Sequence, residues 1–395
     1  MSVTAPRGFE ATGIHCGIKD GDTPDLSLVA TADRQPVAAA GVFTTNKAKA
    51  APVLISQRHL EDGRAAAVVL NSGNANAATG EPGREDSRRT CALVAEGIGV
   101  AATDVLVCST GLIGFRLPME AIEGGVPKLV AELGAGDRAG TAAADAILTT
   151  DTVRKESVAT VTLPDGTTAT VGGMAKGAAM LSPAMATMLA VLTTDAAIDA
   201  DVLREHLATA MDSSFHELVV DGCTSTNDTV LVLANGAAGN DPTAGTDAVA
   251  EAMAHVCADL ASKMAGDAEG ATKHAVVRVR GARSHDDARR AARQVASSQL
   301  VQCSLYGKDP YWGRVLSELG ASGAEMDPEQ VDISYNGVLV CRNGVEALHD
   351  VEAAAAAMQE REVHIDCDLH QGDAHSRVMF TDLTHAYVDE NMGTS

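Results

Sequence analysis

The sequence predicts a layered α/β or α+β fold, and three observations support that prediction. The chain has 395 residues, which is too long for one small core and suits two subdomains or one large layered unit. Strand patterns and amphipathic helix patterns mix irregularly along it. No tandem repeat is present. This irregular mixing favours stacked layers over a strict βαβ series.

Short strands joined by glycine-rich loops are expected in the first half of the chain. The apolar run at 65–70 predicts a buried strand, and the Asn- and Gly-rich stretch 71–76 predicts a loop, because both residue types tolerate positive φ. Pro164-Asp165-Gly166 predicts the turn of a hairpin at 157–171. The other elements expected here are a helix at 85–98, a strand at 104–108, a loop at 109–114 and a helix at 137–148.

The second half carries stronger helix signals. Ser284 is a plausible N-cap for a helix at 284–296. Asn336-Gly337 is typical of a type I′ hairpin turn. The other elements expected here are helices at 201–211, 244–264 and 350–359, strands at 217–220, 229–233 and 275–280, and two closing strands.

The charge balance argues against a nucleic-acid partner. The chain has 53 acidic and 30 basic residues and a formal net charge of −23, whereas phosphate backbones require clustered Lys and Arg. One basic cluster is interspersed with Asp286 and Asp287, which predicts a solvated face. Its members are Arg278, Arg280, Arg283, Arg289, Arg290 and Arg293.

The sequence also predicts a cytoplasmic protein with no membrane partner. No apolar run approaches the roughly 18 residues that span a bilayer, and residues 1–13 lack the pattern of a secretory signal. The eight cysteines form no C-x-x-C pair, so they are expected to be small buried thiols in a reducing compartment.

A set of metal-type residues near the C-terminus is expected to be structural. His364, Cys367, His370 and His375 have a spacing that resembles a metal site. Residues 363–369 alternate apolar and polar, however, which predicts a half-buried strand with Cys367 on the face opposite the histidines. We therefore expect no metal.

The stretch Ser109-Thr110-Gly111-Leu112-Ile113-Gly114 follows a predicted strand but lacks the patterns of a nucleotide-binding loop. It offers a hydroxyl and a backbone N–H side by side, which are the parts of an oxyanion hole. A plain turn explains the residues equally well.

Thr187 is the second candidate for chemistry. A threonine hydroxyl needs an adjacent base, and cleavage of the chain before it would supply its own α-amine, with an ordinary pKa of about 8. Ala186 and the small residues before it suit such a cleavage. From local chemistry alone, a core threonine is still favoured over a nucleophile. No G-x-S-x-G motif supports a serine hydrolase of that class.

Ordered motifs along the whole chain resemble those of the bifunctional ornithine acetyltransferases, also called glutamate N-acetyltransferases. Lys176-Gly177 through Met185-Ala186-Thr187-Met188-Leu189 is similar to the family's K-G-x-x-M-x-x-P-x-M-A-T-M-L signature. The other matching motifs are Gly41-Val42-Phe43-Thr44-Thr45-Asn46, Asn71-Ser72-Gly73-Asn74-Ala75-Asn76, Ser109-Thr110-Gly111, Thr149-Thr150-Asp151-Thr152, Thr224-Ser225-Thr226-Asn227-Asp228, Glu269-Gly270-Ala271, Asp309-Pro310 and Trp312-Gly313-Arg314.

The resemblance implies a self-cleaving enzyme. Cleavage between Ala186 and Thr187 would give an α chain of residues 1–186 and a β chain of 187–395 that form one intertwined catalytic unit. The implied fold is an αββα-type sandwich with a smaller C-terminal α/β subdomain, assembled as an α2β2 heterotetramer. Thr187 would take the acetyl group from N2-acetylornithine and pass it to glutamate in a ping-pong reaction, within cyclic arginine biosynthesis. No cofactor is implied, and acetyl-CoA as a second donor stays open.

The resemblance also assigns site residues by position. Thr110 and Gly111 match the family's oxyanion hole. The positions that match its substrate-binding residues are Thr149, Lys176, Thr187, Glu269, Asn391 and Ser395. A cation such as Lys176 and an anion such as Glu269 suit an amino-acid ligand that carries both charges.

Three departures from the family pattern keep alternatives open. The C-terminal tail is one residue shorter and lacks a tyrosine, Tyr311 replaces a usual asparagine, and Cys223 replaces a usual acidic residue. One alternative is a paralogue that acetylates or deacetylates a related amino acid in a specialised pathway. Another is a self-cleaving amidase or aminopeptidase that uses water as acceptor, and a third is an uncleaved binding protein.

Overall fold

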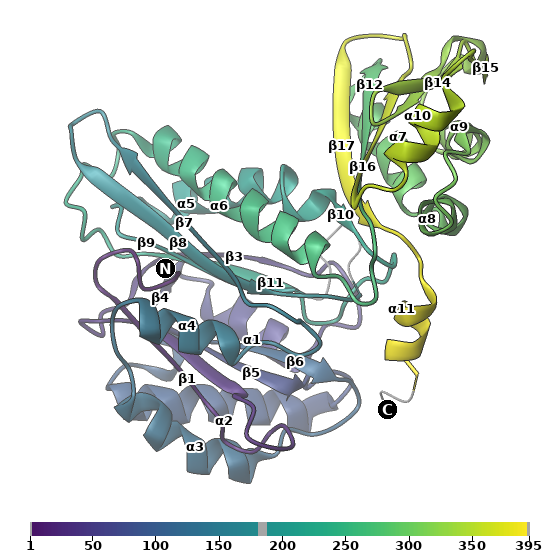
Figure 1. The fold of residues 1–395 in the computed structure, drawn as a ribbon. Coiled ribbons are helices and arrows are strands. Elements are labelled where there is room, and N and C mark those ends of the chain that lie inside the picture. Colours follow the sequence, from purple (N-terminus) through teal and green to yellow (C-terminus); the bar gives the residue numbers. More distant parts are fainter. Residues whose placement is uncertain (1, 181–187, 393–395) are drawn as a thin grey trace.

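The computed structural model describes residues 2–180 and 188–392. It arranges most of them as two stacked sheets covered by helices, with a further α/β unit beside them (Figure 1). Among the described residues, no helix has the length and apolar character that a membrane span requires.

The first sheet contains four strands, and helices cover its outer face. In spatial order the strands are β1 (Phe9–Ile14), β2 (Leu26–Thr31), β5 (Ala67–Asn74) and β6 (Val105–Leu112). The helices on this side are α1 (Ala51–His59), α2 (Gly80–Ile98) and α3 (Met119–Ala131). β5 and β6 run parallel and consist largely of buried residues, as expected for strands covered on both faces.

The second sheet contains six strands. In spatial order these are β4 (Arg64–Ala65), β3 (Val37–Phe43), β11 (Thr229–Ala234), β9 (Leu189–Thr194), β8 (Thr168–Lys176) and β7 (Lys155–Thr162). Helices α5 (Ala200–Asp212) and α6 (Thr246–Gly266) cover the face that points away from the first sheet (Figure 1).

The inner faces of the two sheets share one apolar core. Phe9, Leu70 and Leu106 from the first sheet pack with Leu189 and Leu231 from the second, and all five are buried. Helix α4 (Asp137–Asp145) contributes to the same core. The layer order is therefore helix, sheet, sheet, helix, which confirms the predicted αββα sandwich.

A seven-stranded sheet forms the C-terminal subdomain, as predicted. Its strands in spatial order are β10 (Leu218–Val219), β17 (Ala374–Thr381), β12 (His274–Ala282), β16 (Glu362–Asp368), β13 (Asp332–Tyr335), β14 (Val338–Arg342) and β15 (Val345–Glu346). Its helices are α7 (His285–Ala296), α8 (Gln299–Tyr306), α9 (Trp312–Ala321) and α10 (Val351–Ala357). Three 3-10 turns, η1 (Ala102–Asp104), η2 (Phe215–Glu217) and η3 (Pro328–Gln330), and the helix α11 (His385–Glu390) complete the elements.

Local signals in the sequence correspond well to these elements. The Ser284 hydroxyl accepts a hydrogen bond from the Asp287 N–H and caps α7, as predicted. Asn336 and Gly337 both have positive φ between β13 and β14, which confirms that hairpin turn.

The predicted loops at 71–76 and 109–114 are partly wrong. β5 continues to Asn74 and β6 to Leu112, because the two strands pair with each other at Ser72–Thr110 and Gly73–Gly111.

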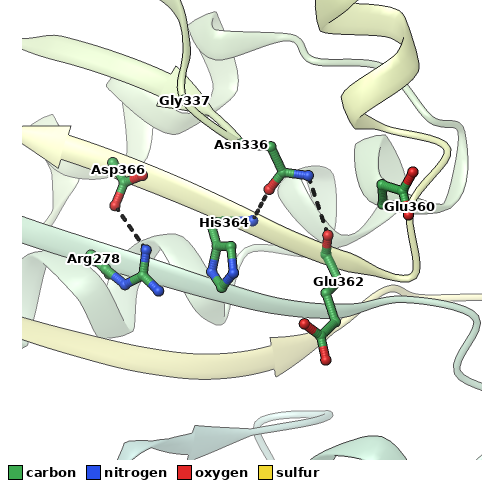
Figure 2. Close-up of a pocket in the computed structure, with 7 residues that line it drawn as sticks. All are labelled: Arg278, Asn336, Gly337, Glu360, Glu362, His364 and Asp366. Carbon is green, nitrogen blue, oxygen red and sulfur yellow. Dashed lines mark hydrogen bonds and ion pairs between the residues drawn. The ribbon is translucent and has the colours of Figure 1, made fainter.

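The metal-type residues near the C-terminus lie on different faces, as the alternating pattern predicts. Cys367 is fully buried in the subdomain core. His364 lies between Arg278 and Glu362 beside a polar cavity on the other face (Figure 2). Within residues 2–180 and 188–392, no group of three His, Cys, Asp or Glu side chains is arranged to hold a metal ion.

The basic cluster agrees with its prediction, and the cysteines agree only in part. Arg278, Arg280 and Arg290 form ion pairs with Asp366, Asp368 and Asp287, respectively, on a solvated face. The cysteines are free, but Cys223 and Cys303 are exposed and Cys16 is only partly buried, so the prediction of buried thiols is wrong for these three.

Candidate active site

The site begins where β8 ends and β9 starts. Lys176, the last residue of β8, pairs with Leu189, the first residue of β9. The chain between them includes Ala186 and Thr187, which lie outside the described residues. Met188 is buried at the head of β9, and its backbone N–H donates to Asp228 Oδ1 over 3.0 Å. The described chain therefore resumes at this end of the second sheet.

A cavity of about 340 Å³ opens at the same end of the sandwich. Six of the predicted site residues line it together: Thr110, Gly111, Thr149, Lys176, Glu269 and Asn391. Ser395, like Thr187, lies outside the described residues. The cavity is also lined by Gly73, Leu112, Thr150, Ala179 and Met180, which stand in the motifs described above, and by Lys19 and Glu390, which stand in none of them.

The Thr110-Gly111 pair sits on the carboxyl end of β6. Gly111 has φ +131°, and a Cβ atom there would lie 2.2 Å from the carbonyl carbon of Gly73. Only glycine fits this close approach of two backbones. The neighbouring carbonyl of Ser109 accepts a hydrogen bond from Asn227 Nδ2 over 2.8 Å. A hydroxyl and an N–H are thus held rigidly at the cavity wall.

Lys176 is a buried cation in the cavity lining. Its Nζ donates to Thr149 Oγ1 over 2.6 Å and to Thr110 Oγ1 over 3.4 Å. Burial lowers the pKa of Lys176, while the carboxylate of Asp151, 3.6 Å from Nζ, raises it. Burial alone would raise the pKa of Asp151, but Lys176 and Lys155 outweigh it and hold that pKa at about 2. Asp151 is therefore ionised at neutral pH.

Glu269 supplies an anion to the cavity lining. Its Oε2 accepts from Asn391 Nδ2 over 2.8 Å. Asn391 directly follows α11, which leaves the C-terminal subdomain and returns beside the sandwich (Figure 1). The helix approaches so closely that a Cβ on Gly270 would lie 2.3 Å from the Tyr387 nitrogen. This close contact brings Asn391 to the cavity.

Asp228 is a buried carboxyl group whose environment the sequence did not reveal. Its Oδ1 accepts from the Met188 N–H, whereas its Oδ2 has no hydrogen-bond partner among the described residues. Burial raises the pKa of Asp228 well above its usual range, against the effect of the Met188 N–H. The motif that contains Asp228 was visible in the sequence, but its isolation from water was not.

The Asp228→Asn substitution is expected to change the pH dependence of stability. Because the folded pKa is raised, the Asp228 carboxyl stabilises the fold most below its unfolded pKa, and this contribution is lost as pH rises through the folded pKa. The variant has no such carboxyl group. Its free energy of unfolding, relative to that of the original protein, should therefore increase with rising pH, by up to about 1.4 kcal/mol per pH unit. Melting temperatures of both proteins from about pH 4 to pH 8 test this. Parallel curves would contradict the assignment of a raised pKa.

Two of the residues that depart from the family pattern lie away from the cavity lining. Tyr311 is 52% exposed in the C-terminal subdomain, where the Arg314 guanidinium lies 5.7 Å from its ring centre. Cys223 is exposed beside Asp221, whose Oδ1 accepts from the Cys223 N–H.

The cavity itself offers a hydroxyl and an N–H for a developing oxyanion, and a cation and an anion for an amino acid.

Comparison with known proteins places the chain in a family. The ArgJ family matches residues 10–393. The chain is 47% identical to the arginine biosynthesis bifunctional protein ArgJ of Mycobacterium leprae over 403 residues, covering 100% of this chain and 96% of that protein. It is also 47% identical to the ArgJ protein of Streptomyces coelicolor over 396 residues, with 100% of both covered.

A solved structure of ornithine acetyltransferase from Mycobacterium tuberculosis, complexed with ornithine, is similar as well. It shares 43% identity with a TM-score of 0.42, and the match covers 48% of this chain and 96% of that one. The extent and identity of the matches to curated relatives decide the assignment: the chain belongs to the ArgJ family.

Proposed function

We propose that this protein transfers the acetyl group of N2-acetylornithine to glutamate, giving ornithine and N-acetylglutamate for arginine biosynthesis. One observation carries the proposal. A single cavity gathers Thr110, Gly111, Lys176 and Glu269, and Lys176 pairs with Leu189, the first residue of β9, two residues after Thr187 in the chain. The names of the curated relatives, which are arginine biosynthesis bifunctional proteins, support the same pathway.

The nucleophile in this proposal is Thr187, freed by cleavage after Ala186. The α chain would comprise residues 1–186 and the β chain 187–395, and strands of both would share the second sheet, since β8 precedes the cleavage point and β9 follows it. The α-amine of Thr187 accepts the hydroxyl proton while Oγ forms a bond to the acetyl carbon. The amide C–N bond then breaks, and the departing ornithine amine takes up the proton. The glutamate amine attacks the resulting ester, and Oγ regains a proton as it leaves.

The remaining site residues would bind the substrates and stabilise the oxyanion. The Thr110 hydroxyl and the Gly111 N–H would donate to the oxyanion in both half-reactions. Lys176 would pair with the substrate carboxylate and Glu269 with its ammonium group. Thr149, Asn391 and Ser395 would complete the substrate contacts.

Transfer to glutamate is the decisive test. With purified protein, N-acetylornithine and glutamate, we expect ornithine and N-acetylglutamate in equal amounts without metal, cofactor or acetyl-CoA. Acetate release without N-acetylglutamate would favour the amidase alternative. A single uncut band on a denaturing gel, with no turnover, would favour a binding protein.

Acetyl-CoA is a second donor to be tested. Formation of N-acetylglutamate from acetyl-CoA and glutamate would make the enzyme bifunctional.

The same preparation would reveal the proposed α2β2 assembly by its mass in solution. The eight cysteines, none of them in a disulfide, suit the reducing conditions of the cytoplasm.

A further inference from the structure

A buried lysine forms ion pairs with two carboxylates that lie within two residues of the cavity lining in the chain. Lys155, the first residue of β7, has a side chain that is 0% exposed. Its Nζ donates to Asp151 Oδ1 over 2.6 Å, to Asp267 Oδ2 over 2.5 Å and to the Val153 carbonyl over 3.2 Å. These three acceptors use all three donors of the ammonium group. Lys155 does not line the cavity, so its side chain does not contact a substrate bound there.

Asp151 connects this lysine to the cavity. Its Oδ1 accepts from Lys155 Nζ and also from the Gly177 N–H over 2.7 Å. Its Oδ2 accepts from the Thr149 N–H over 3.2 Å and lies 3.6 Å from Lys176 Nζ. The orientation of one buried carboxylate thus sets the positions of Thr149 and Lys176, and Lys155 sets the orientation of that carboxylate.

Asp267 connects the same lysine to the segment that carries Glu269. It caps the end of α6 and accepts through Oδ2 from the N–H groups of Thr152 and Val153, over 3.0 and 3.3 Å. Glu269 follows two residues later and lines the cavity. Lys155 therefore joins the segments that carry both the cationic and the anionic side of the site.

The charges in this network balance. Lys155 and Lys176 face Asp151 and Asp267, with two charges of each sign. Burial of Lys176 lowers its pKa, Asp151 raises it, and Lys155 lowers it again by repulsion. The titratable groups that act on the Lys176 ammonium are Lys19, Asp151, Lys155, Asp228 and Glu269.

We propose that Lys155 is a positioning residue for acetyl transfer, which holds Asp151 and Asp267 so that Lys176, Thr149 and Glu269 face the substrate correctly. This inference rests on the proposed function. Lys155 acts through Asp151 and Asp267 and never touches the reacting atoms.

The test compares Lys155→Met with a matched control, Lys273→Met. Lys273 is another buried lysine, 4% exposed, whose Nζ donates to the carbonyls of Gln359 and Glu360 away from the cavity. Both substitutions should lower the melting temperature, because each leaves buried polar groups unpaired. Only Lys155→Met should lower kcat/KM for acetyl transfer, by at least about tenfold, a change of about 1.4 kcal/mol in the activation free energy.

The pH profile gives a readout that a purely structural role would not move. Removal of the Lys155 charge should raise the pKa of Lys176 and shift the alkaline limb of kcat/KM to higher pH. If Lys155→Met does not fold, Lys155→Met/Asp267→Asn removes one charge of each sign and should show a smaller shift in the same direction, because Asp151 and not Asp267 forms the ion pair with Lys176. A folded Lys155 variant with the original kcat/KM and pH profile would refute the positioning role. Absence of N-acetylglutamate with the unaltered protein would instead refute the proposed function.

Discussion

Replacement of Thr187 by alanine is expected to leave a single uncut chain of 40.5 kDa with no acetyltransferase activity. Alanine has no hydroxyl to attack the preceding peptide bond or the acetyl carbonyl, so both self-cleavage and turnover should be lost. Loss of a covalent nucleophile typically reduces kcat by about 10⁴-fold or more. A denaturing gel and the acetyl-transfer assay measure the two effects separately.

Thr187→Ser is the matched control, because it keeps a hydroxyl at the same position. We expect this variant to be cut and to retain measurable transfer. A Thr187→Ala protein that is cut and active would contradict the assignment of the nucleophile.

The second large effect is expected from Gly111→Ala. Alanine would carry the strain of a positive φ, about 1–3 kcal/mol, and its Cβ would lie 2.2 Å from the Gly73 carbonyl carbon unless β5 and β6 move apart. Either change displaces the Gly111 N–H from the oxyanion. Loss of one such donor typically lowers kcat by about 10²- to 10³-fold.

Gly114→Ala separates this effect from backbone strain. Gly114 also has positive φ, +92°, but nothing lies within 4 Å of the position that its Cβ would take. We expect a lower melting temperature from both variants and a large loss of kcat only from Gly111→Ala. Equal losses of kcat would show that the N–H of Gly111 has no special place in the reaction.

Elements encoded by nearby residues were predictable. The Ser284 cap, the Asn336-Gly337 turn and the hairpin that encloses Pro164-Asp165-Gly166 all depend on contacts a few residues apart, and all three appear in the structure. The extension of β5 and β6 was not predictable in this way. It depends on pairing between Ser72 and Thr110, which are far apart in the chain, and Asn- and Gly-rich composition favours loops when the partner strand is unknown.

The residues of the candidate site also differ in whether the sequence alone could predict them. Thr110, Gly111, Thr149 and Lys176 stand in recognisable motifs, and so does Glu269, so the sequence predicted these residues before their proximity was known. Lys19 carries no motif, and it lines the cavity because Nζ donates to the Pro24 and Leu148 carbonyls.

The sequence by itself determined the family and the layered fold class, because ordered motifs and local patterns can be recognised without knowledge of long-range contacts. Only the tertiary structure decided which charges are buried together. Lys155 and Asp267 are 112 residues apart, and Glu269 and Asn391 are 122 apart, yet each pair meets at the site. Burial removes the water that would otherwise screen these groups, so the strength of their pairing depends on folding rather than on sequence neighbours.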